Sequence, residues 1–177
     1  MSAFSSFLIY NPITREILEL PEVLLPPSPE TNVNYLRGPS GFAFDATTST
    51  YKVVFTWVLH NMQNGMAITA VHIYSLGSGW WRRIEDLPTF LHFKSDSSQV
   101  FLNGALHWEI NGVDYDEPYI GAIDIATEKF IAIQQPLTDF ESQRKDVIVG
   151  TLRGYLTLVV DRPDQFLIWV MKDYGVV

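Results

Sequence analysis

A hairpin pattern of about 14 residues recurs along this chain of 177 residues and limits the folds open to it. Three copies read FLIYNPITREILEL (7–20), VHIYSLGSGWWRRI (71–84) and IGAIDIATEKFIAI (120–133), and a fourth, FLIWVMKDYGVV, starts at Phe166. Each places a polar turn between a short apolar strand and a strand with apolar residues at alternate positions. Units that recur at a fixed spacing and cannot bury a face alone are typical of solenoids and propellers. The pattern therefore predicts a repeat fold that serves binding rather than chemistry.

Strand signals cover nearly the whole sequence. Short runs rich in Val, Ile, Thr, Tyr, Phe and Trp are separated by turn clusters, and a helical period is absent over any useful length. Asn103-Gly104 is the strongest hairpin signal, because a type I′ turn needs two residues that tolerate positive φ. Arg153-Gly154 is expected to play the same part further along. The chain is predicted to be all-β.

The hairpins join into four-stranded units, whose strands we call a to d from the inside outwards. The first unit reads GFAFD, YKVVFTWVL, AVHIYSL, WWRRIE, the second QVFLN, ALHWEI, YIGAID, KFIAIQ, and the third VIVGTL, GYLTLVV, FLIWVMK. Their starts lie roughly 50 residues apart, the length of a kelch-type propeller blade. We therefore predict a partial, incomplete β-propeller of four-stranded antiparallel blades, about three blades plus a leading hairpin that supplies only strands c and d.

This register places the connections on two different faces. The a-b and c-d turns are short and should share one face, while the b-c loops (60–66, 111–118 and 161–164) and the d-a connections should share the other. Residues 21–40, PEVLLPPSPETNVNYLRGPS, are too rich in proline for a ladder strand and are expected to be irregular. Long loops on a rigid scaffold commonly carry binding residues.

Composition excludes several classes of protein. The chain is 47% hydrophobic and has a formal net charge of -8, which argues against nucleic acid as a partner because a phosphate-binding surface needs clustered Lys and Arg. It has no cysteine, so neither a disulfide framework nor a thiolate metal site can form. Its N-terminus lacks the basic and apolar regions of a signal peptide, and its apolar runs are too short to cross a bilayer. The cytoplasm or nucleus is the expected location, without membrane association.

Catalytic motifs are missing from the sequence. The four histidines form no close ligand pair, and the sequence contains no nucleophile elbow, phosphate loop or dinucleotide fingerprint. His107, beside Trp108 in an apolar strand, is expected to be a core or interface residue. Tryptophans in strand patterns are expected to pack between blades, although one of the adjacent Trp80 and Trp81 should be more exposed than the other. No metal or cofactor is predicted.

The best candidate site is the loop that carries Asp114, Asp116 and Glu117, which we call the acidic loop. Several interpretations of it remain open. It can be a solvated loop, a partner-binding loop whose tyrosines supply rigid contact area, or the carboxylate pair of a glycosidase or a Ca²⁺ site. The sequence lacks the glycine and downstream Glu of a calcium loop. The candidate contact residues are Asn64, Asp114, Tyr115, Asp116, Glu117 and Tyr119. Asn64 comes from a different loop, the one expected after the second strand of the first blade.

Seven segments in order carry a family resemblance. YNPITREILELP, GFAFDATTSTYKVV, IYSLGSGWWRRI, VFLNGALHW, IDIATEKF, LRGYLTLV and IWVMKDYGV resemble the successive signatures of the F-box associated domain of plant F-box proteins. The resemblance covers most of the chain and implies a kelch-related propeller fold. It also implies a non-catalytic module that binds a target protein as the substrate receptor of an SCF-type ubiquitin ligase.

The chain also departs from the family pattern. Nothing before Phe7 could form the F-box that binds a Skp-type adaptor, and the expected Ser-Trp strand does not follow IWVMKDYGV. We therefore expect residues 1–177 to be one interaction domain, truncated at both ends, that does not bind the adaptor alone. The competing hypothesis is a propeller enzyme such as a glycosidase that uses the loop carboxylates.

Overall fold

The described part of the chain consists of strands and turns. The computed structural model describes residues 6–23, 33–61, 63, 67–84, 87, 91–93, 97, 99–112, 118–134, 146–161 and 165–174, and every regular element in these ranges is a β-strand, as predicted. The strands are β1 (Leu8–Tyr10), β2 (Ile17–Glu19), β3 (Val33–Asp45), β4 (Thr50–Asn61), β5 (Ala67–Ser75), β6 (Trp81–Arg83), β7 (Leu91–Phe93), β8 (Gln99–Leu102), β9 (Ala105–Gly112), β10 (Pro118–Asp124), β11 (Phe130–Gln134), β12 (Asp146–Leu152), β13 (Tyr155–Asp161) and β14 (Phe166–Met171).

These strands form four antiparallel sheets that follow the predicted register. The leading hairpin is β1-β2, blade 1 is β3-β4-β5-β6, and blade 3 is β12-β13-β14. Blade 2 has the order β11-β10-β9, and both β7 and β8 pair with β9. Its inner strand is thus divided into two short pieces, of which the sequence predicts only the second.

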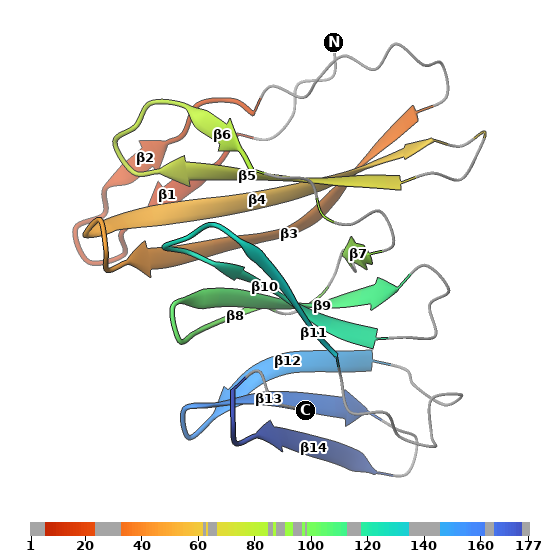
Figure 1. Ribbon diagram of the computed structural model, residues 1–177. Coiled ribbons are helices and arrows are strands. Elements are labelled where there is room, and N and C mark those ends of the chain that lie inside the picture. The colour runs from red at the N-terminus through yellow and green to blue at the C-terminus, as the bar shows by residue number, and fades with distance from the viewer. Residues whose placement is uncertain are drawn as a thin grey trace.

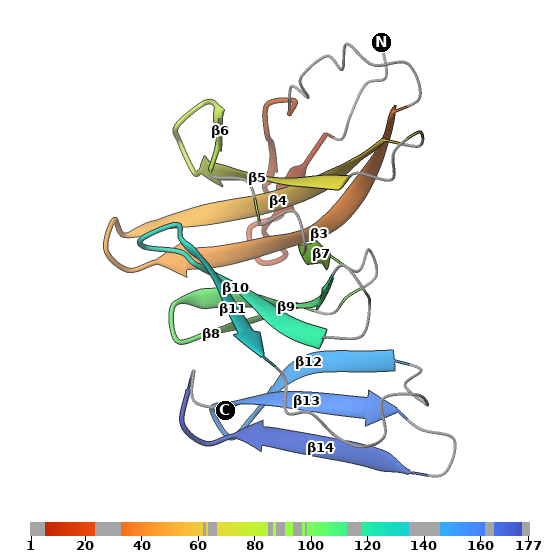
Figure 2. The same cartoon turned by 45° about the vertical axis from the view of Figure 1, so that its right-hand side comes forward.

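The sheets stack one after another like the blades of a propeller (Figures 1 and 2). The inner strand β3 lies against β8 and β9, and β12 lies against the same two strands. The β3–β4, β5–β6, β8–β9 and β12–β13 turns all lie at the left of Figure 1, whereas β4, β9 and β13 end at the right. The predicted partial propeller, with its short turns on one face, is confirmed.

One five-residue turn recurs three times on this face, with the sequences NPITR, DATTS and DIATE. A side-chain oxygen of its first residue accepts a backbone N–H two or three residues later, at 3.0 Å for Asn11, 2.9 Å for Asp45 and 2.7 Å for Asp124. The fifth residue is left-handed in each case, with φ of 61° at Arg15, 53° at Ser49 and 59° at Glu128. Short polar side chains that bond to their own backbone favour such turns. The two-residue turns at Asn103-Gly104 and Arg153-Gly154 also have positive φ, as predicted.

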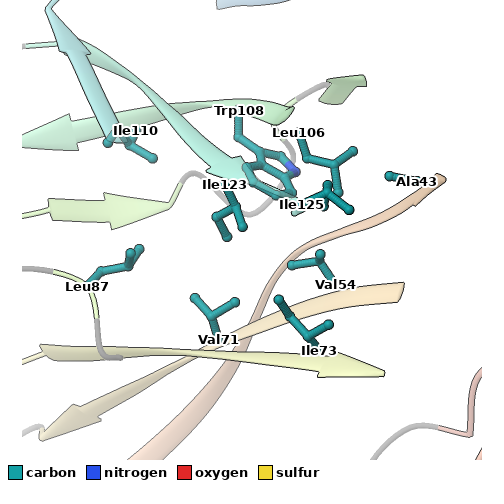
Figure 3. Close-up of a cluster of buried hydrophobic side chains, with 10 residues drawn as sticks. All are labelled: Ala43, Val54, Val71, Ile73, Leu87, Leu106, Trp108, Ile110, Ile123 and Ile125. Carbon is teal, nitrogen blue, oxygen red and sulfur yellow. The ribbon is translucent and has the colours of Figure 1, made fainter. Parts of the chain in front are cut away.

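Alternation along the strands builds a separate core on each side of a blade. The core between blades 1 and 2 contains Val54, Val71 and Ile73 from blade 1, facing Trp108 and Ile123 from blade 2 (Figure 3). A second core lies between blades 2 and 3, and two smaller ones lie between the leading hairpin and blade 1. Because successive residues of a strand point to opposite faces, Val54 and Phe55 enter different cores. Each blade is therefore apolar on both faces.

The expectation that residues 21–40 are irregular is wrong for the last eight. Strand β3 already begins at Val33, and its pairing with β4 shifts between Arg37 and Ser40. This bulge takes Pro39, which has no N–H to donate, out of the ladder. The Thr56 hydroxyl donates a hydrogen bond of 2.6 Å to the Pro39 carbonyl. Strand β3 can therefore contain a proline, because at the bulge no backbone N–H is needed to pair with β4.

Candidate partner-binding surface

Most of the predicted contact residues lie outside the described part of the chain. These are Asn64, Asp114, Tyr115, Asp116 and Glu117. Tyr119 belongs to β10, where its backbone is paired with Gln134 of β11 and Ile110 of β9. The acidic-loop hypothesis therefore remains a prediction.

The described residues present a different candidate, which we call the aromatic patch: Phe42, Phe44 and Tyr51. Phe42 and Phe44 lie on β3 and Tyr51 on β4, and their exposed fractions are 46%, 43% and 45%. The Tyr51 ring stacks on Phe42 at a centroid distance of 5.0 Å and meets Phe44 edge-on at 5.1 Å. The Tyr51 ring thus joins the two phenylalanine rings into one contiguous, half-exposed apolar surface, and contiguous exposed apolar surfaces are typical of interaction sites.

The patch is bare because the leading hairpin covers only part of blade 1. Val53 is paired with Phe42 and follows Tyr51 by two residues, so it shares their face of the sheet. Val53 is nevertheless buried, because Leu20 and Ile9 of the hairpin segment pack on its cluster. Further along the same face, Phe7 meets Phe55 at 4.9 Å. The aromatic patch is therefore the exposed continuation of an existing interface.

A buried charged network holds the strands of the patch from the opposite face. Lys52 Nζ lies 2.8 Å from Asp45 Oδ2 and 2.9 Å from Glu128 Oε1, and it donates to the Ile125 carbonyl at 2.8 Å. Glu128 also pairs with Arg82 of β6. The network joins the β3–β4 turn of blade 1 to the β10–β11 turn of blade 2. It fixes the end of the hairpin that carries Phe44 and Tyr51.

The pKa values in this network favour the charged forms. The hydrogen bond from Lys52 holds the pKa of Asp45 well below its usual range. Burial alone would lower the pKa of Lys52, but its bonds to Asp45 and Glu128 outweigh burial and raise it. Burial likewise opposes ionisation of Glu128, yet Arg82 and Lys52 lower its pKa. Asp45, Lys52 and Glu128 are therefore charged at neutral pH, and their paired arrangement fits a structural role better than acid-base chemistry.

The tryptophans largely follow the sequence prediction. Trp57 and Trp108 are buried, whereas Trp80 is 58% exposed and its neighbour Trp81 is only partly exposed. Trp81 packs on Phe7 and donates from Nε1 to the Pro21 carbonyl at 2.6 Å. Trp169 differs from the expectation of core packing, with 39% of its surface exposed. It lies on β14, which no fourth strand covers among the described residues of blade 3.

His107 is an interface histidine, as predicted. It is fully buried, its Nδ1 lies 3.3 Å from the Val100 carbonyl, and its Nε2 lies 2.6 Å from the Tyr174 hydroxyl. Because a carbonyl can only accept, Nδ1 carries the proton and the neutral ring accepts from Tyr174 through Nε2. Burial lowers the pKa of His107 below its ordinary value and raises that of Tyr174. The pair ties the segment after β14 to blade 2.

Other kinds of site are not seen in the described ranges. No group of three His, Asp or Glu residues there is placed to hold a metal ion. The same ranges contain no helix with the length and hydropathy needed to cross a membrane.

Sequence reasoning missed the aromatic patch, although a signal for it exists. In GFAFD the aromatic residues alternate with Gly41 and Ala43, and both of these face blade 2, where Leu106 packs against Gly41. The small residues mark the covered face, so the large ones must point the other way. Whether that other face is covered depends on the leading hairpin, and the sequence does not show how far the hairpin reaches.

Comparisons with a family model and with curated proteins both indicate the same family. The family model described as the F-box associated beta propeller domain matches residues 1–176. The chain is similar to three Arabidopsis thaliana proteins, with 28% identity to the putative F-box protein At5g42430, 21% to the F-box protein At1g52495 and 29% to the putative F-box protein At1g46840. These alignments cover 93%, 97% and 93% of this chain but only 40%, 40% and 32% of the relatives. The chain thus spans less than half the length of these curated relatives. No solved structure matches it.

Proposed function

Because the chain belongs to the F-box associated β-propeller family, we propose that it is a non-catalytic interaction module that recognises a target protein. In a whole protein of the relatives' kind, this module would select the substrate of an SCF-type ubiquitin ligase. The chain on its own is expected to bind no Skp-type adaptor, nucleic acid, membrane or cofactor. It would act in the cytoplasm or nucleus.

The aromatic patch carries this proposal. Phe42, Phe44 and Tyr51 expose nearly half of their surface on a sheet held rigid from behind by the Lys52 network. Rigid aromatic side chains lose little conformational entropy on binding, and aromatic residues are enriched among those that dominate binding energy. The acidic loop that contains Asp114 and Asp116 remains a second predicted contact region for the same target.

The test compares partners of the wild-type chain with those of a patch variant. The immobilised chain and a Phe42→Ser/Tyr51→Ser variant would each recover proteins from an Arabidopsis thaliana extract, and every differential partner would be purified and titrated calorimetrically. We expect at least one binary complex whose affinity falls roughly tenfold or more in the variant, since truncated hot-spot residues commonly cost over about 1.4 kcal/mol. Phe101→Ser is the matched control, because Phe101 is 41% exposed but lies on β8, against the opposite face of β3.

Three results would contradict the proposal in different ways. Equal binding by the wild-type chain and the patch variant would show that the target binds at a site other than the aromatic patch. A complex between this chain and a purified Skp-type adaptor would show that our assignment of adaptor binding to a separate segment is wrong. A glycosidase activity that Asp116→Asn abolishes would replace the binding function with the enzymatic alternative.

A further inference from the structure

The last blade presents an uncovered apolar face, which we call the trailing face. In blade 3, Val147, Val149 and Leu158 point into the core shared with blade 2. The register of β12, β13 and β14 places a second set of residues on the opposite side of the sheet. Its apolar members are Ile148, Leu152, Tyr155, Val159, Phe166, Ile168 and Val170. Phe166, Ile168 and Ile148 expose 70%, 59% and 50% of their surface.

The leading hairpin presents the complementary end of the stack, which we call the leading face. Ile9 and Leu18 are paired, and Ile9 packs towards blade 1. Their neighbours along β1 and β2 therefore point away from blade 1. The apolar members of this face are Leu8, Tyr10 and Ile17, with exposed fractions of 62%, 55% and 66%. In both views of the fold, the hairpin and blade 3 lie at opposite ends of the stack (Figures 1 and 2).

The chain already joins faces of these two kinds internally. Every blade has a leading side, turned towards the N-terminal end of the stack, and a trailing side, turned towards the C-terminal end. The trailing side of blade 1 packs on the leading side of blade 2, and the trailing side of blade 2 packs on the leading side of blade 3. In the first of these interfaces, Leu106 of blade 2 approaches so closely that a Cβ on Gly41 would lie 2.6 Å from its Cδ1. Gly150 occupies the inner strand on the trailing face of blade 3, and no atom in the described part of the chain lies within 4 Å of its Cβ position. The trailing face thus repeats a docking surface whose counterpart is filled within the chain.

We propose that the trailing face of one copy of this chain docks on the leading face of a second copy, giving head-to-tail self-association. The contact continues the blade-on-blade interface that the fold uses twice, and it sets β14 of one copy against β1 and β2 of the other. The contact is heterologous, so it closes a ring when the rotation permits and otherwise extends. Two copies supply twice the three larger sheets of one chain, which reaches the size of ordinary propellers of about 4 to 8 blades.

The test places a charge separately on each face. Light scattering coupled to size-exclusion chromatography over a wide concentration range should show association of the wild-type chain. Leu8→Glu/Ile17→Glu and Phe166→Glu/Ile168→Glu should each be monomeric, with association weakened at least tenfold. All four residues are exposed, so unchanged circular dichroism and melting are expected to show that both variants fold. Ala46→Glu/Ala126→Glu adds the same charge at exposed turn positions away from both faces and should associate like wild type.

Mixing the two monomeric variants gives the decisive result. Each retains one intact face, so an equimolar mixture should form a one-to-one dimer that does not grow further. A mixture that stays monomeric would overturn the head-to-tail arrangement. A single variant that still dimerises by itself would also overturn it and would indicate pairing of like faces. A wild-type chain that is monomeric at every concentration would overturn self-association altogether and leave these faces to another occupant, such as further blades or the target. Because no target protein is used, these outcomes are independent of the proposed recognition function.

Discussion

Lys52 Nζ on β4 lies 2.9 Å from Glu128 Oε1 in the β10–β11 turn, which joins two blades across 76 residues of sequence. The lysine side chain is only 6% exposed, and its other anionic partner, Asp45, is 1% exposed. Burying charges is costly, and removal of one partner leaves the others without compensation. The pair therefore makes the register between blades 1 and 2 sensitive to a single side chain.

We predict that Lys52→Met lowers the free energy of unfolding by about 3–5 kcal/mol, the usual cost of breaking a buried pair from one side. Urea denaturation followed by tryptophan fluorescence would measure it. Lys129→Met is the matched control, because Lys129 is an exposed neighbour of Glu128, and it should change stability by less than about 0.5 kcal/mol. Equal effects of the two substitutions would show that the network contributes nothing specific.

Two glycine substitutions should distinguish the side of blade 1 that blade 2 covers from the exposed trailing face of blade 3. Gly41→Ala places a methyl group 2.6 Å from Leu106 Cδ1 and 2.7 Å from Gln99 Oε1. Over-packing of this kind costs about 1–3 kcal/mol. Gly150→Ala meets no described atom within 4 Å, so at concentrations at which the chain is monomeric it should be neutral or slightly stabilising, since glycine weakens a strand interior. Thermal unfolding of both variants at such concentrations would test the difference, and a large loss from Gly150→Ala there would mean that its face is covered within the chain itself.

The left-handed position of the recurring turn should favour glycine. Ser49 has a φ of 53°, which costs an L-residue about 1–2 kcal/mol. Ser49→Gly should therefore raise the melting temperature, and Ser49→Val should lower it because a branched side chain fits this region worst. Differential scanning calorimetry of the two variants provides the check. If valine were tolerated as well as glycine, the turn would have to adopt a different backbone in solution.

Stability should fall as the solution is acidified through the range in which histidine titrates. The buried His107 has a lowered pKa in the folded chain, so the unfolded chain takes up a proton first, near its ordinary pKa of about 6.5. The contribution of neutral His107 to the free energy of unfolding is therefore complete above that pH and declines as the pH falls below it. Chemical denaturation at pH 7.5 and 5.5, as suitable points about the usual value near 6.5, should show this decline.

His107→Gln is expected to reduce that pH dependence, whatever its effect on stability at neutral pH. Tyr174→Phe should keep the dependence, because burial rather than the hydroxyl is the main cause of the lowered pKa, while losing about 1 kcal/mol for the hydrogen bond. The same pH dependence in wild type and His107→Gln would assign it to other groups.

The sequence alone determined most of the strands, their grouping into blades and the face that carries the short turns. These features depend on local signals: alternation of period two, and turn residues such as Asn103-Gly104 that adopt positive φ. The same reasoning failed at Pro39, because a bulge is set by the partner strand, and it did not predict β7. The extent of the domain over residues 1–177 and the acidic-loop contacts remain predictions.

Only the tertiary structure decided which apolar faces are covered. Val53 and Tyr51 follow the same alternation on β4, yet Val53 is buried under the leading hairpin and Tyr51 is 45% exposed in the aromatic patch. Likewise, no local pattern pairs Lys52 with Glu128, since they meet only when blade 2 stacks on blade 1. Local periodicity specifies which side of a strand is apolar, but the packing of distant segments determines whether that side becomes core or a binding surface.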